Sequence, residues 1–279
     1  MEPGRSPPGN GKEKQNESEG EGEGGFDICP RKQGGGVVLK PSLLAKNREV
    51  RRGSKSGGSK TVVLLGPGMV LLKGYLQLSD QQKIVEKCRE LGVGSGGFYH
   101  PGYGQSKMHL KMMCLGKNWD PETGQYGDHR PFDGAKPPQI PPEFHHLVSN
   151  ALAALPPDTP NPFPLPSIAP DICIVNFYSQ TGRLGLHQDK DESEDSLRQG
   201  FPVVSFSIGD SADFLYSDHR DLDQPHKLLL NSGDVLIFGG PSRLIFHGVS
   251  VVHPNTAPAL LLQNTNLRPG RLNLTFRHY

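Results

Sequence analysis

The sequence predicts a mainly β domain of the α+β kind, a jelly roll or barrel preceded by helices. From Ile172 onward, short apolar runs alternate with turn residues, and no helical pattern separates them. Two helical patterns stand before this region, and glycine (35) and proline (26) are frequent, as in a loop-rich chain. Many short strands without intervening helices indicate a sandwich or barrel rather than a parallel α/β sheet.

The first 60 residues differ from the rest and are expected to form a largely disordered extension. Residues 1–25 carry no large apolar side chain after Met1, so they cannot bury enough surface to offset the entropy of ordering. Two apolar islands, 26–30 and 37–44, are candidates for docking onto the body. The basic stretch 46–60 is compatible with a phosphate-binding or nuclear-import patch and equally with a solvated linker. The folded domain is expected to span 61–279.

The first half of this domain is predicted to mix strands, helices and an irregular region. Apolar runs at 62–65 and 70–72 indicate strands. Ser79 and Gln82 have the spacing of a capping box, which predicts a helix to about Leu91, ended by Gly92. Residues 94–142 are rich in Gly, Pro and Tyr and show little periodicity. Apolar residues at helical spacing then predict a second helix over about 142–155.

Nine short runs in the second half are predicted to be strands of a core over about 171–279. They are Ile172–Tyr178, Leu184–Asp189, Val203–Ile208, Asp213–Tyr216, Lys227–Leu230, Asp234–Phe238, Leu244–Val249, Ala259–Leu262 and Leu272–Phe276.

Composition narrows the class and compartment of the protein. Lys and Arg (30) nearly balance Asp and Glu (29), so no global field points to a nucleic-acid partner. The cysteines, Cys29, Cys88, Cys114 and Cys173, form no CxxC pair and are expected to be reduced packing residues. No apolar run approaches the ~20 residues of a membrane span. The acidic, apolar-poor start resembles neither a signal peptide nor a transit peptide, so we expect a location in the nucleus or cytoplasm, or both.

Three polar residues in the strand-rich half form a candidate metal site. His187 and Asp189 lie two apart, so on a strand or its extended exit they project to the same face. His247 lies within another apolar strand, where a buried imidazole needs a partner for its nitrogens. Each residue alone is commonly an ordinary core or surface group. Two imidazoles and one carboxylate together are the ligand set of non-haem Fe(II) oxygenases, which leaves half of an octahedron open.

The last strand adds a second requirement of such a site. Alternation puts Leu272, Leu274 and Phe276 on one face and four polar residues, Arg271, Asn273, Thr275 and Arg277, on the other. A solvated polar face is the ordinary interpretation of this pattern. Two arginines on one face, however, suit a dicarboxylate, because each guanidinium can grip a carboxylate by two parallel hydrogen bonds. With the histidines upstream, we favour the second interpretation. A hydrolytic zinc site would not explain the arginines.

Several motifs carry a resemblance to a known family: Asn176–Tyr178, Leu186–Glu192, Gly233–Val235, Gly239–Arg243, Phe246–Gly248 and Arg271–Arg277. Over about Gly94 to Arg277 the sequence resembles the AlkB family of Fe(II)/2-oxoglutarate-dependent dioxygenases. The resemblance implies a double-stranded β-helix, a jelly roll, with N-terminal helices and a nucleotide-recognition lid, here about 94–142. The extension 1–60 lies outside the match.

The resemblance also implies residue roles. His187, Asp189 and His247 would hold Fe(II). Arg271, with Asn176 and Tyr178, would hold the distal carboxylate of 2-oxoglutarate, and Arg277, helped by Asn273, the carboxylate beside the keto group. These are therefore the candidate cofactor-binding residues: Asn176, Tyr178, Arg271, Asn273 and Arg277.

The candidate substrate-binding residues are Trp119, Tyr126 and Asp191. Trp119 and Tyr126 match the family's base-stacking pair, although the chain's only tryptophan could instead be a packing residue. Asp191 matches the acidic residue that meets the damaged base. A carboxylate and an indole face both favour a cationic ring such as 1-methyladenine or 3-methylcytosine. Glu194 and Asp195 are interpreted as a solvated acidic loop.

The resulting hypothesis is oxidative demethylation of N-alkylated bases in DNA or RNA, including N6-methyladenine, with O2 consumed and formaldehyde, succinate and CO2 released. No protein acid or base is obligatory for this chemistry, and the base must leave its stack. We expect a monomer and no membrane partner. Two alternatives remain at this stage: a 2-oxoglutarate oxygenase acting on a protein or small molecule, and a non-catalytic nucleic-acid-binding module.

Overall fold

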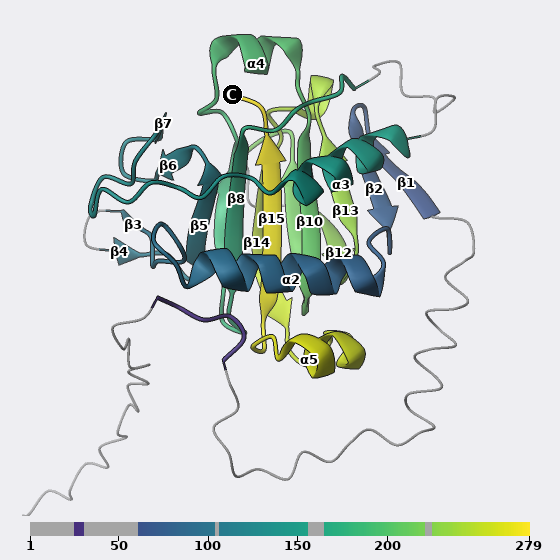
Figure 1. Ribbon diagram of the computed structural model, residues 1–279. Helices are drawn as coiled ribbons and strands as arrows, with labels where there is room; N and C mark the ends of the chain where they lie inside the picture. Colours follow the sequence, from purple (N-terminus) through teal and green to yellow (C-terminus); the bar gives the residue numbers. More distant parts are fainter. Residues whose placement is uncertain (1–24, 31–60, 104–105, 156–164, 221–224) are drawn as a thin grey trace, which may run out of the picture.

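The computed structural model describes residues 25–30, 61–103, 106–155, 165–220 and 225–279. These residues form a sandwich of a seven-stranded major sheet and a four-stranded minor sheet. Every strand pair in the two sheets is antiparallel. The prediction of a mainly β, jelly-roll fold is thereby confirmed, and Figure 1 shows the minor-sheet strand β14 behind the major sheet.

The major sheet has the order β1 (Thr61–Gly66), β2 (Met69–Lys73), β13 (Val235–Phe238), β10 (Val203–Gly209), β15 (Arg271–Arg277), β8 (Ile172–Tyr178) and β5 (Lys111–Gly116). The minor sheet has the order β12 (His226–Leu230), β11 (Ser211–Ser217), β14 (Phe246–His253) and β9 (Leu184–His187). Two small hairpins lie beside them, β3 (Gly102–Tyr103) with β4 (Ser106–Lys107), and β6 (Asn118–Asp120) with β7 (Gln125–Gly127).

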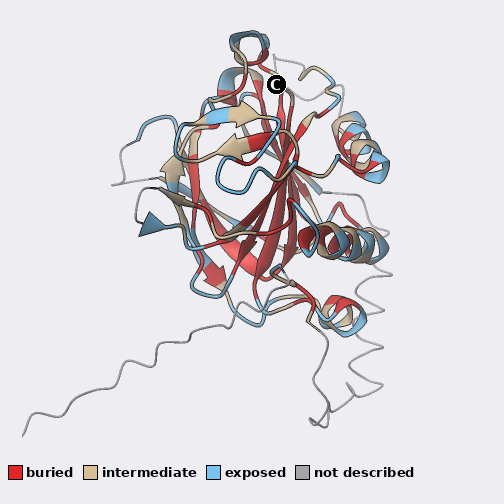
Figure 2. Cartoon of the chain, turned by 60° about the vertical axis from the view of Figure 1, so that its left-hand side comes forward, coloured by how far each residue is buried: buried red, intermediate tan, exposed pale blue. Residues whose placement is uncertain are grey.

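Two helices, α2 (Leu78–Gly92) and α3 (Pro142–Ala153), cross the outer face of the major sheet (Figure 1). Their buried side chains join the apolar face of the sheet in one large cluster, where Phe144 of α3 meets Phe276 edge to face at 6.1 Å. Leu272, Leu274 and Phe276 are fully buried in this cluster, so the polar face of β15 must point the other way, between the sheets. Figure 2 shows buried strands at the centre of the molecule, and β8, β10 and β15 are buried at every position.

Three sequence predictions of local structure are wrong. The helix α2 begins at Leu78 after an extended Gln77, without a side-chain cap, so Ser79 lies inside the helix and forms no capping box. The helix thus begins two residues earlier than a cap at Ser79 would allow, directly after the buried Leu76, whose amide donates to the Gly233 carbonyl at 2.9 Å. The run Ala259–Leu262 is not a strand but the start of helix α5 (Ala259–Thr265), which buries Leu261.

The third error concerns the acidic segment after Asp191. Glu194 and Asp195 are exposed, as expected, but they open a short helix, α4 (Glu194–Gln199). The Ser193 hydroxyl accepts a hydrogen bond from the Ser196 amide, and the two acids lie in the first turn, where the helix dipole favours them. The segment ends at Gly200 in the left-handed conformation. The serine cap, the acidic first turn and the final glycine of this helix can all be recognised in the sequence.

The segment 25–30 docks onto the body, as its apolar character suggested. Ile28 and Cys29 are buried, and the Ile28 carbonyl accepts a hydrogen bond from the Arg268 amide at 2.8 Å. The Asp27 carboxylate forms an ion pair with Arg89 of α2 at 2.9 Å. The second apolar island and the basic stretch 46–60 lie outside the described residues.

The four cysteines are free and buried, as expected of packing residues. Among the described residues, no helix is long and apolar enough to cross a membrane.

Candidate metal centre

Two neighbouring strands of the minor sheet bring the three candidate metal ligands together. His187 ends β9, His247 lies in β14, and the two are paired in register, with their ring centroids 4.4 Å apart. Asp189 follows β9, and its carboxylate oxygens lie 3.8 Å from Nε2 of His187 and 3.7 Å from Nε2 of His247. One possible ligand atom from each residue lies within 4.8 Å of the others. Residues 58 positions apart thus converge on one point.

Hydrogen bonds to the backbone orient both imidazoles. The Nδ1 atoms contact carbonyl oxygens two residues earlier, of Gly185 at 2.9 Å and of Ile245 at 3.1 Å. A proton on each Nδ1 would satisfy these carbonyls and leave a lone pair on each Nε2, the atom that faces Asp189. This second interaction on the far nitrogen is typical of metal-binding histidines.

The charge states of the cluster suit a cation. Burial, with the neighbouring His187, lowers the pKa of His247 to about 4, so that its ring is neutral near pH 7. Burial alone would raise the pKa of Asp189, but Arg277 and the two imidazoles outweigh it and hold that pKa below its usual range. A neutral imidazole and an ionised carboxylate are the forms that bind metals.

The Arg277 side chain, at the end of β15, contacts several polar side chains. Its guanidinium contacts both carboxylate oxygens of Asp189, at 2.6 and 3.0 Å, and lies 3.3 Å from Glu192. It also donates to the Tyr126 hydroxyl at 3.2 Å, and this hydroxyl donates to Glu192 at 3.1 Å. Arg243 holds the other Glu192 oxygen at 2.8 Å and donates to the Asp189 carbonyl. This set, the Arg277 network, links the metal cluster to the β6–β7 hairpin.

Arg271, at the other end of β15, has the opposite surroundings. It is 1% exposed, yet its Nε and one terminal nitrogen have no hydrogen-bond partner among the described residues. The Oδ1 atom of Asn176 is also buried without a partner. Register pairs Arg271 with Tyr178 and Asn176 with Asn273. Burial lowers the pKa of Arg271 to about 10 and raises that of Tyr178 to about 12. A buried guanidinium without an anion is costly, so this place fits a carboxylate ligand.

Asn273 differs from its predicted surroundings. Its amide nitrogen donates to the Ser205 hydroxyl at 2.8 Å and to the Phe206 carbonyl at 2.9 Å, while its oxygen accepts from Thr275. Its donors are therefore used within the protein, and it lies where it fixes β15 against β10.

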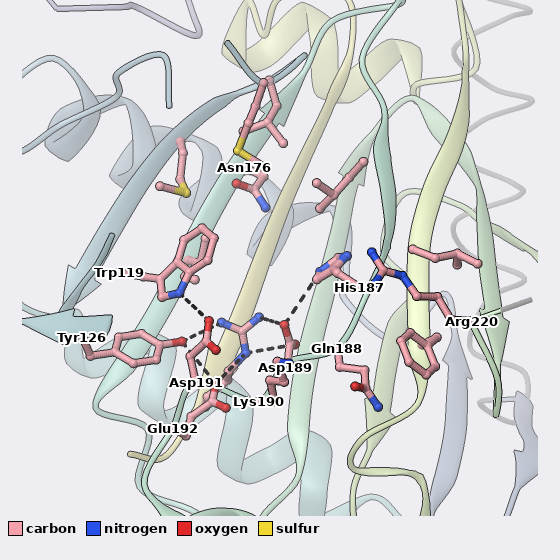
Figure 3. Close-up of a pocket in the computed structure, with 18 residues that line it drawn as sticks. Trp119, Tyr126, Asn176, His187, Gln188, Asp189, Lys190, Asp191, Glu192 and Arg220 are labelled. Carbon is pink, nitrogen blue, oxygen red and sulfur yellow. Dashed lines mark hydrogen bonds and ion pairs between the residues drawn. The ribbon is translucent and has the colours of Figure 1, made fainter. Parts of the chain in front are cut away.

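A cavity of about 390 Å³ opens above the metal cluster. One wall carries His187, Asp189 and Arg277, and the opposite wall carries Trp119 and Tyr126, which face each other across the β6–β7 hairpin. The indole N–H of Trp119 donates to Asp191 at 2.9 Å (Figure 3). The three substrate candidates therefore line this cavity together with His187 and Asp189, and His247 is paired with His187 on the neighbouring strand.

Two buried members of the Arg277 network, Glu192 and Arg243, have no predicted role. Both lie within the family motifs, but the sequence does not predict that they pair. The signal available was the presence of ionic residues beside apolar strands, since a charge buried there needs a partner.

The donor set and the unpaired guanidinium fit Fe(II) and 2-oxoglutarate. Two imidazoles and a carboxylate on one side of a cavity match a non-haem iron site with open positions. The orphaned atoms of Arg271 and Asn176 are the polar groups that a bound carboxylate would satisfy.

Comparisons with known proteins agree with this geometry. The family model described as the 2OG-Fe(II) oxygenase superfamily matches residues 68–277. The chain is 60% identical over 262 residues to the DNA N(6)-methyladenine demethylase ALKBH1C of Arabidopsis thaliana, covering 91% of this chain and 56% of that protein. It therefore spans little more than half the length of that relative.

Two further matches cover nearly all of their own chains. The alpha-ketoglutarate-dependent dioxygenase AlkB homolog of Caulobacter vibrioides is 36% identical over 218 residues, which are 76% of this chain and 87% of that protein. The solved structure of OsALKBH1 superposes with a TM-score of 0.73 at 56% identity, covering 78% of this chain and 100% of that one.

Proposed function

The chain belongs to the AlkB family within the 2OG-Fe(II) oxygenase superfamily, and from this premise we propose that it oxidatively demethylates N-methylated bases in nucleic acid. The observation that carries the proposal is the cavity lined by His187 and Asp189, two members of the metal cluster, together with Trp119 and Tyr126. A flat, aromatic-walled cavity above a metal cluster suits a base that has left its stack.

Family membership supports the enzyme class and the cofactors expected from the sequence, namely Fe(II) and 2-oxoglutarate with O2 as co-substrate. When bound, Fe(II) and 2-oxoglutarate with O2 would supply the oxidation of the N-methyl carbon of the base. The hydroxymethyl product would then release formaldehyde. The protein contributes binding, orientation and exclusion of water.

The residue roles are part of the proposal. His187, Asp189 and His247 would bind the iron through Nε2, a carboxylate oxygen and Nε2. Arg271, with Asn176 and Tyr178 on the neighbouring strand, would bind the distal carboxylate of 2-oxoglutarate, because its nitrogens lack partners inside the protein.

At the other end of β15, Arg277 would share its guanidinium between Asp189 and the carboxylate beside the keto group. Asn273 would act by positioning β15, because its amide already bonds to β10.

The names of the relatives and the chemistry of the cavity favour different methylated bases. The Arabidopsis relatives are named DNA N(6)-methyladenine demethylases, which supports N6-methyladenine in DNA as the first substrate to test. Asp191 and the Trp119 indole would instead favour cationic rings such as 1-methyladenine and 3-methylcytosine. In the structure the Asp191 carboxylate is occupied by the indole N–H, so a cationic base would compete with that bond.

The test is formaldehyde release, followed by mass spectrometry, from single-stranded and duplex DNA and RNA that carry each of these marks. We expect release only when Fe(II), 2-oxoglutarate and O2 are all present. Trp119→Ala should reduce turnover of methylated oligonucleotides by up to about 100-fold, because stacking of a base contributes about 1–3 kcal/mol. The same variant should retain succinate formation without substrate, which His187→Ala should lose. Full turnover of a methylated peptide or metabolite by Trp119→Ala would instead support another substrate class.

Compartment and assembly complete the proposal. We place the enzyme in the nucleus or cytoplasm, as a monomer that acts on DNA or RNA. Imaging of a fluorescent fusion and sedimentation of the purified chain test these two points, and a membrane-bound or oligomeric protein would contradict them.

A further inference from the structure

Residues 25–30, called the strap from here on, are attached to the outer side of the protein. The Asp27 carboxylate contacts Arg89 of α2, with Nε and a terminal nitrogen each at 2.9 Å, and it also accepts from the Cys29 amide at 2.8 Å. Ile28 and Cys29 are buried. In Figure 1 the strap, drawn in purple, passes below α2 near the end of the major sheet where β15 begins. The function proposed above gives this segment no role.

The strap also holds the loop 266–270, which leads from α5 into β15. The Arg268 amide donates to the Ile28 carbonyl at 2.8 Å, and Arg268 Nε donates to the Asp27 carbonyl at 2.7 Å. The same guanidinium lies over the Phe26 ring, 5.1 Å from its centroid. These interactions join one residue of the loop to three consecutive residues of the strap, so the loop is tied through the strap to the outer helix α2.

The last residue of this loop packs tightly between two strands of the major sheet. Gly270 has a φ of +139°, in the region that favours glycine, and a Cβ there would lie 2.3 Å from the Tyr178 carbonyl oxygen. The Gly270 carbonyl accepts a hydrogen bond from the Asp210 amide at 2.8 Å. Arg271 follows directly and is paired in register with Tyr178 on one side and Gly209 on the other. The course of the loop therefore sets where the Arg271 backbone enters the sheet.

Phe26 reaches the same place through an aromatic contact. Its ring lies 5.6 Å from the ring of Phe177, which is buried between Asn176 and Tyr178 in the sequence of β8. The Phe177 ring also lies 3.1 Å from the place that a Gly270 Cβ would take. Because side chains alternate along a strand, Phe177 faces the strap while its two neighbours face the space between the sheets. The strap thus packs directly behind the residues proposed to bind the distal carboxylate of 2-oxoglutarate.

The Arg271 guanidinium needs such support because it has few side-chain partners of its own. Two of its nitrogens form no hydrogen bond among the described residues, whereas Arg277 at the other end of β15 is fixed by its contacts with Asp189. A side chain without these bonds is oriented by its backbone and by the packing around it, and a ligand-binding group must be held to within about 0.5 Å to be effective. The strap is the part of the chain that packs on both the loop before Arg271 and the strand beside it.

We propose that the strap positions Arg271 for 2-oxoglutarate, so that docking of the strap and binding of the distal carboxylate strengthen each other. The inference rests on the role proposed above for Arg271 and not on which methylated base is the substrate. Phe26 and Arg268 are positioning residues in this arrangement, since they act through the start of β15 and do not line the cavity above the metal cluster. A strap that only covered apolar surface would change the stability of the protein but not its preference among ligands.

The test measures the binding of two ligands to the full chain by calorimetry, with Mn(II) in place of Fe(II) and with O2 excluded. One ligand is 2-oxoglutarate, and the other is 2-oxobutyrate, which has no distal carboxylate. In Phe26→Ala we expect 2-oxoglutarate to bind about tenfold more weakly, because one well-aligned hydrogen bond to a charged group contributes about that factor. The affinity for 2-oxobutyrate should be unchanged. Phe26→Leu, which keeps an apolar contact with Phe177, should restore most of the affinity.

Phe132→Ala is the matched control variant. Phe132 also packs against a neighbouring ring, that of Tyr99 at 5.2 Å, and it also lies under a guanidinium, that of Arg130 at 4.8 Å. It belongs to the segment after the β6–β7 hairpin and has no contact with the strap among those described. This variant should bind both ligands as the unchanged chain does. Melting temperatures of the ligand-free variants show that each is folded at the temperature of the titration.

Hydrogen exchange of the unchanged chain gives a second measurement that needs no turnover. The Arg268 amide is bonded to the Ile28 carbonyl, so its exchange reports undocking of the strap. Coupling between two binding events is reciprocal, so 2-oxoglutarate at saturation should slow this exchange by about the same tenfold factor. 2-Oxobutyrate at saturation should leave the exchange unchanged.

The inference and the proposed function can fail separately. Should no methylated base release formaldehyde while Phe26→Ala loses affinity for 2-oxoglutarate alone, demethylation fails and the role of the strap stands. Three results would overturn the role of the strap: equal affinity for 2-oxoglutarate in Phe26→Ala and Phe132→Ala, an equal loss for both ligands in Phe26→Ala, or exchange of the Arg268 amide that does not respond to 2-oxoglutarate.

Discussion

The two arginines at the ends of β15 share a strand, a face and nearly complete burial, yet their surroundings are opposite. Arg277 contacts two carboxylates and a tyrosine hydroxyl, whereas two nitrogens of Arg271 have no partner among the described residues. The charged form of Arg277 is stabilised so far that its pKa rises despite burial, while burial lowers the pKa of Arg271. One end of the strand is therefore organised by the protein itself, and the other is arranged for a ligand.

The strongest test of the difference between Arg271 and Arg277 is to remove each guanidinium in turn. Arg277→Met leaves Asp189 beside only the imidazoles, and we expect it to lower the free energy of unfolding by about 3–5 kcal/mol. Arg271→Met removes an unpaired buried charge, so the ligand-free protein should be unchanged or slightly more stable. Chemical denaturation of the metal-free, 2-oxoglutarate-free proteins measures both. Equal losses in the two variants would show that Arg271 is paired in solution and that the contrast is not real.

A pH titration tests the charge states at the Arg277 end of β15, where Asp189 and His247 lie. The folded pKa of His247 is depressed from 6.5 to about 4, so between these values the unfolded chain takes up a proton that the folded chain does not. Stability should thus fall as the pH drops from 6.5 to 4, by up to about 3 kcal/mol from this residue. The Asp189 pKa is also depressed, and its contribution should be lost only below about pH 4.

The measurement is the free energy of unfolding of metal-free protein at several pH values, with His247→Gln as the control that cannot titrate. The two proteins should converge as the pH falls towards 4. Parallel curves for the two would mean that His247 is as accessible to protons as in the unfolded chain.

The Arg271 end of β15 is tested by the binding of 2-oxoglutarate itself, with Mn(II) in place of Fe(II) and with O2 excluded. At a ligand concentration 100 times its Kd, the protein should gain about 2.7 kcal/mol. 2-Oxobutyrate, which lacks the distal carboxylate, is the matched control and should bind more weakly. In Arg271→Met the two ligands should bind alike. A persistent preference for 2-oxoglutarate in that variant would place the distal carboxylate away from Arg271.

Some elements of the fold could be predicted from the sequence and others could not. Period-two alternation identified β15, and short apolar runs bounded by turn residues identified β8 and β10, nearly to their ends. The same rule failed for Ala259–Leu262, since four apolar residues are too few to separate a strand from the start of a helix. Nothing in the local pattern showed that β5, within the irregular segment 94–142, completes the edge of the major sheet.

For the site, the sequence indicated the residue types and the family motifs indicated their roles. Neither showed which of these residues contact each other. His187, Asp189 and His247 were singled out by spacing and chemistry, and the structure brings them together. That Arg277 is saturated while Arg271 is not depends on where Glu192, Arg243 and Tyr126 arrive in space. Partners that are distant in sequence cannot be deduced from one chain's periodicity.

The smallest expected effect concerns the hydroxyl that joins the hairpin to the Arg277 network. Tyr126→Phe removes the bonds to Arg277 and Glu192 but keeps the ring that faces Trp119. Because Asp189 still holds Arg277 through two contacts, the free energy of unfolding should fall by only about 1 kcal/mol. Tyr279→Phe, on the residue that packs edge to face on Tyr126, is the matched control and should change little.

The size of this loss decides which group organises the end of β15. A small loss with turnover of methylated oligonucleotides kept within a few-fold means that Asp189 and Glu192 fix Arg277, and that the hairpin adds only the aromatic wall. A loss near that of Arg277→Met would mean that the hairpin positions the guanidinium. The end of the strand would then become organised only when the β6–β7 hairpin is in place, and it would resemble the Arg271 end more than the structure indicates.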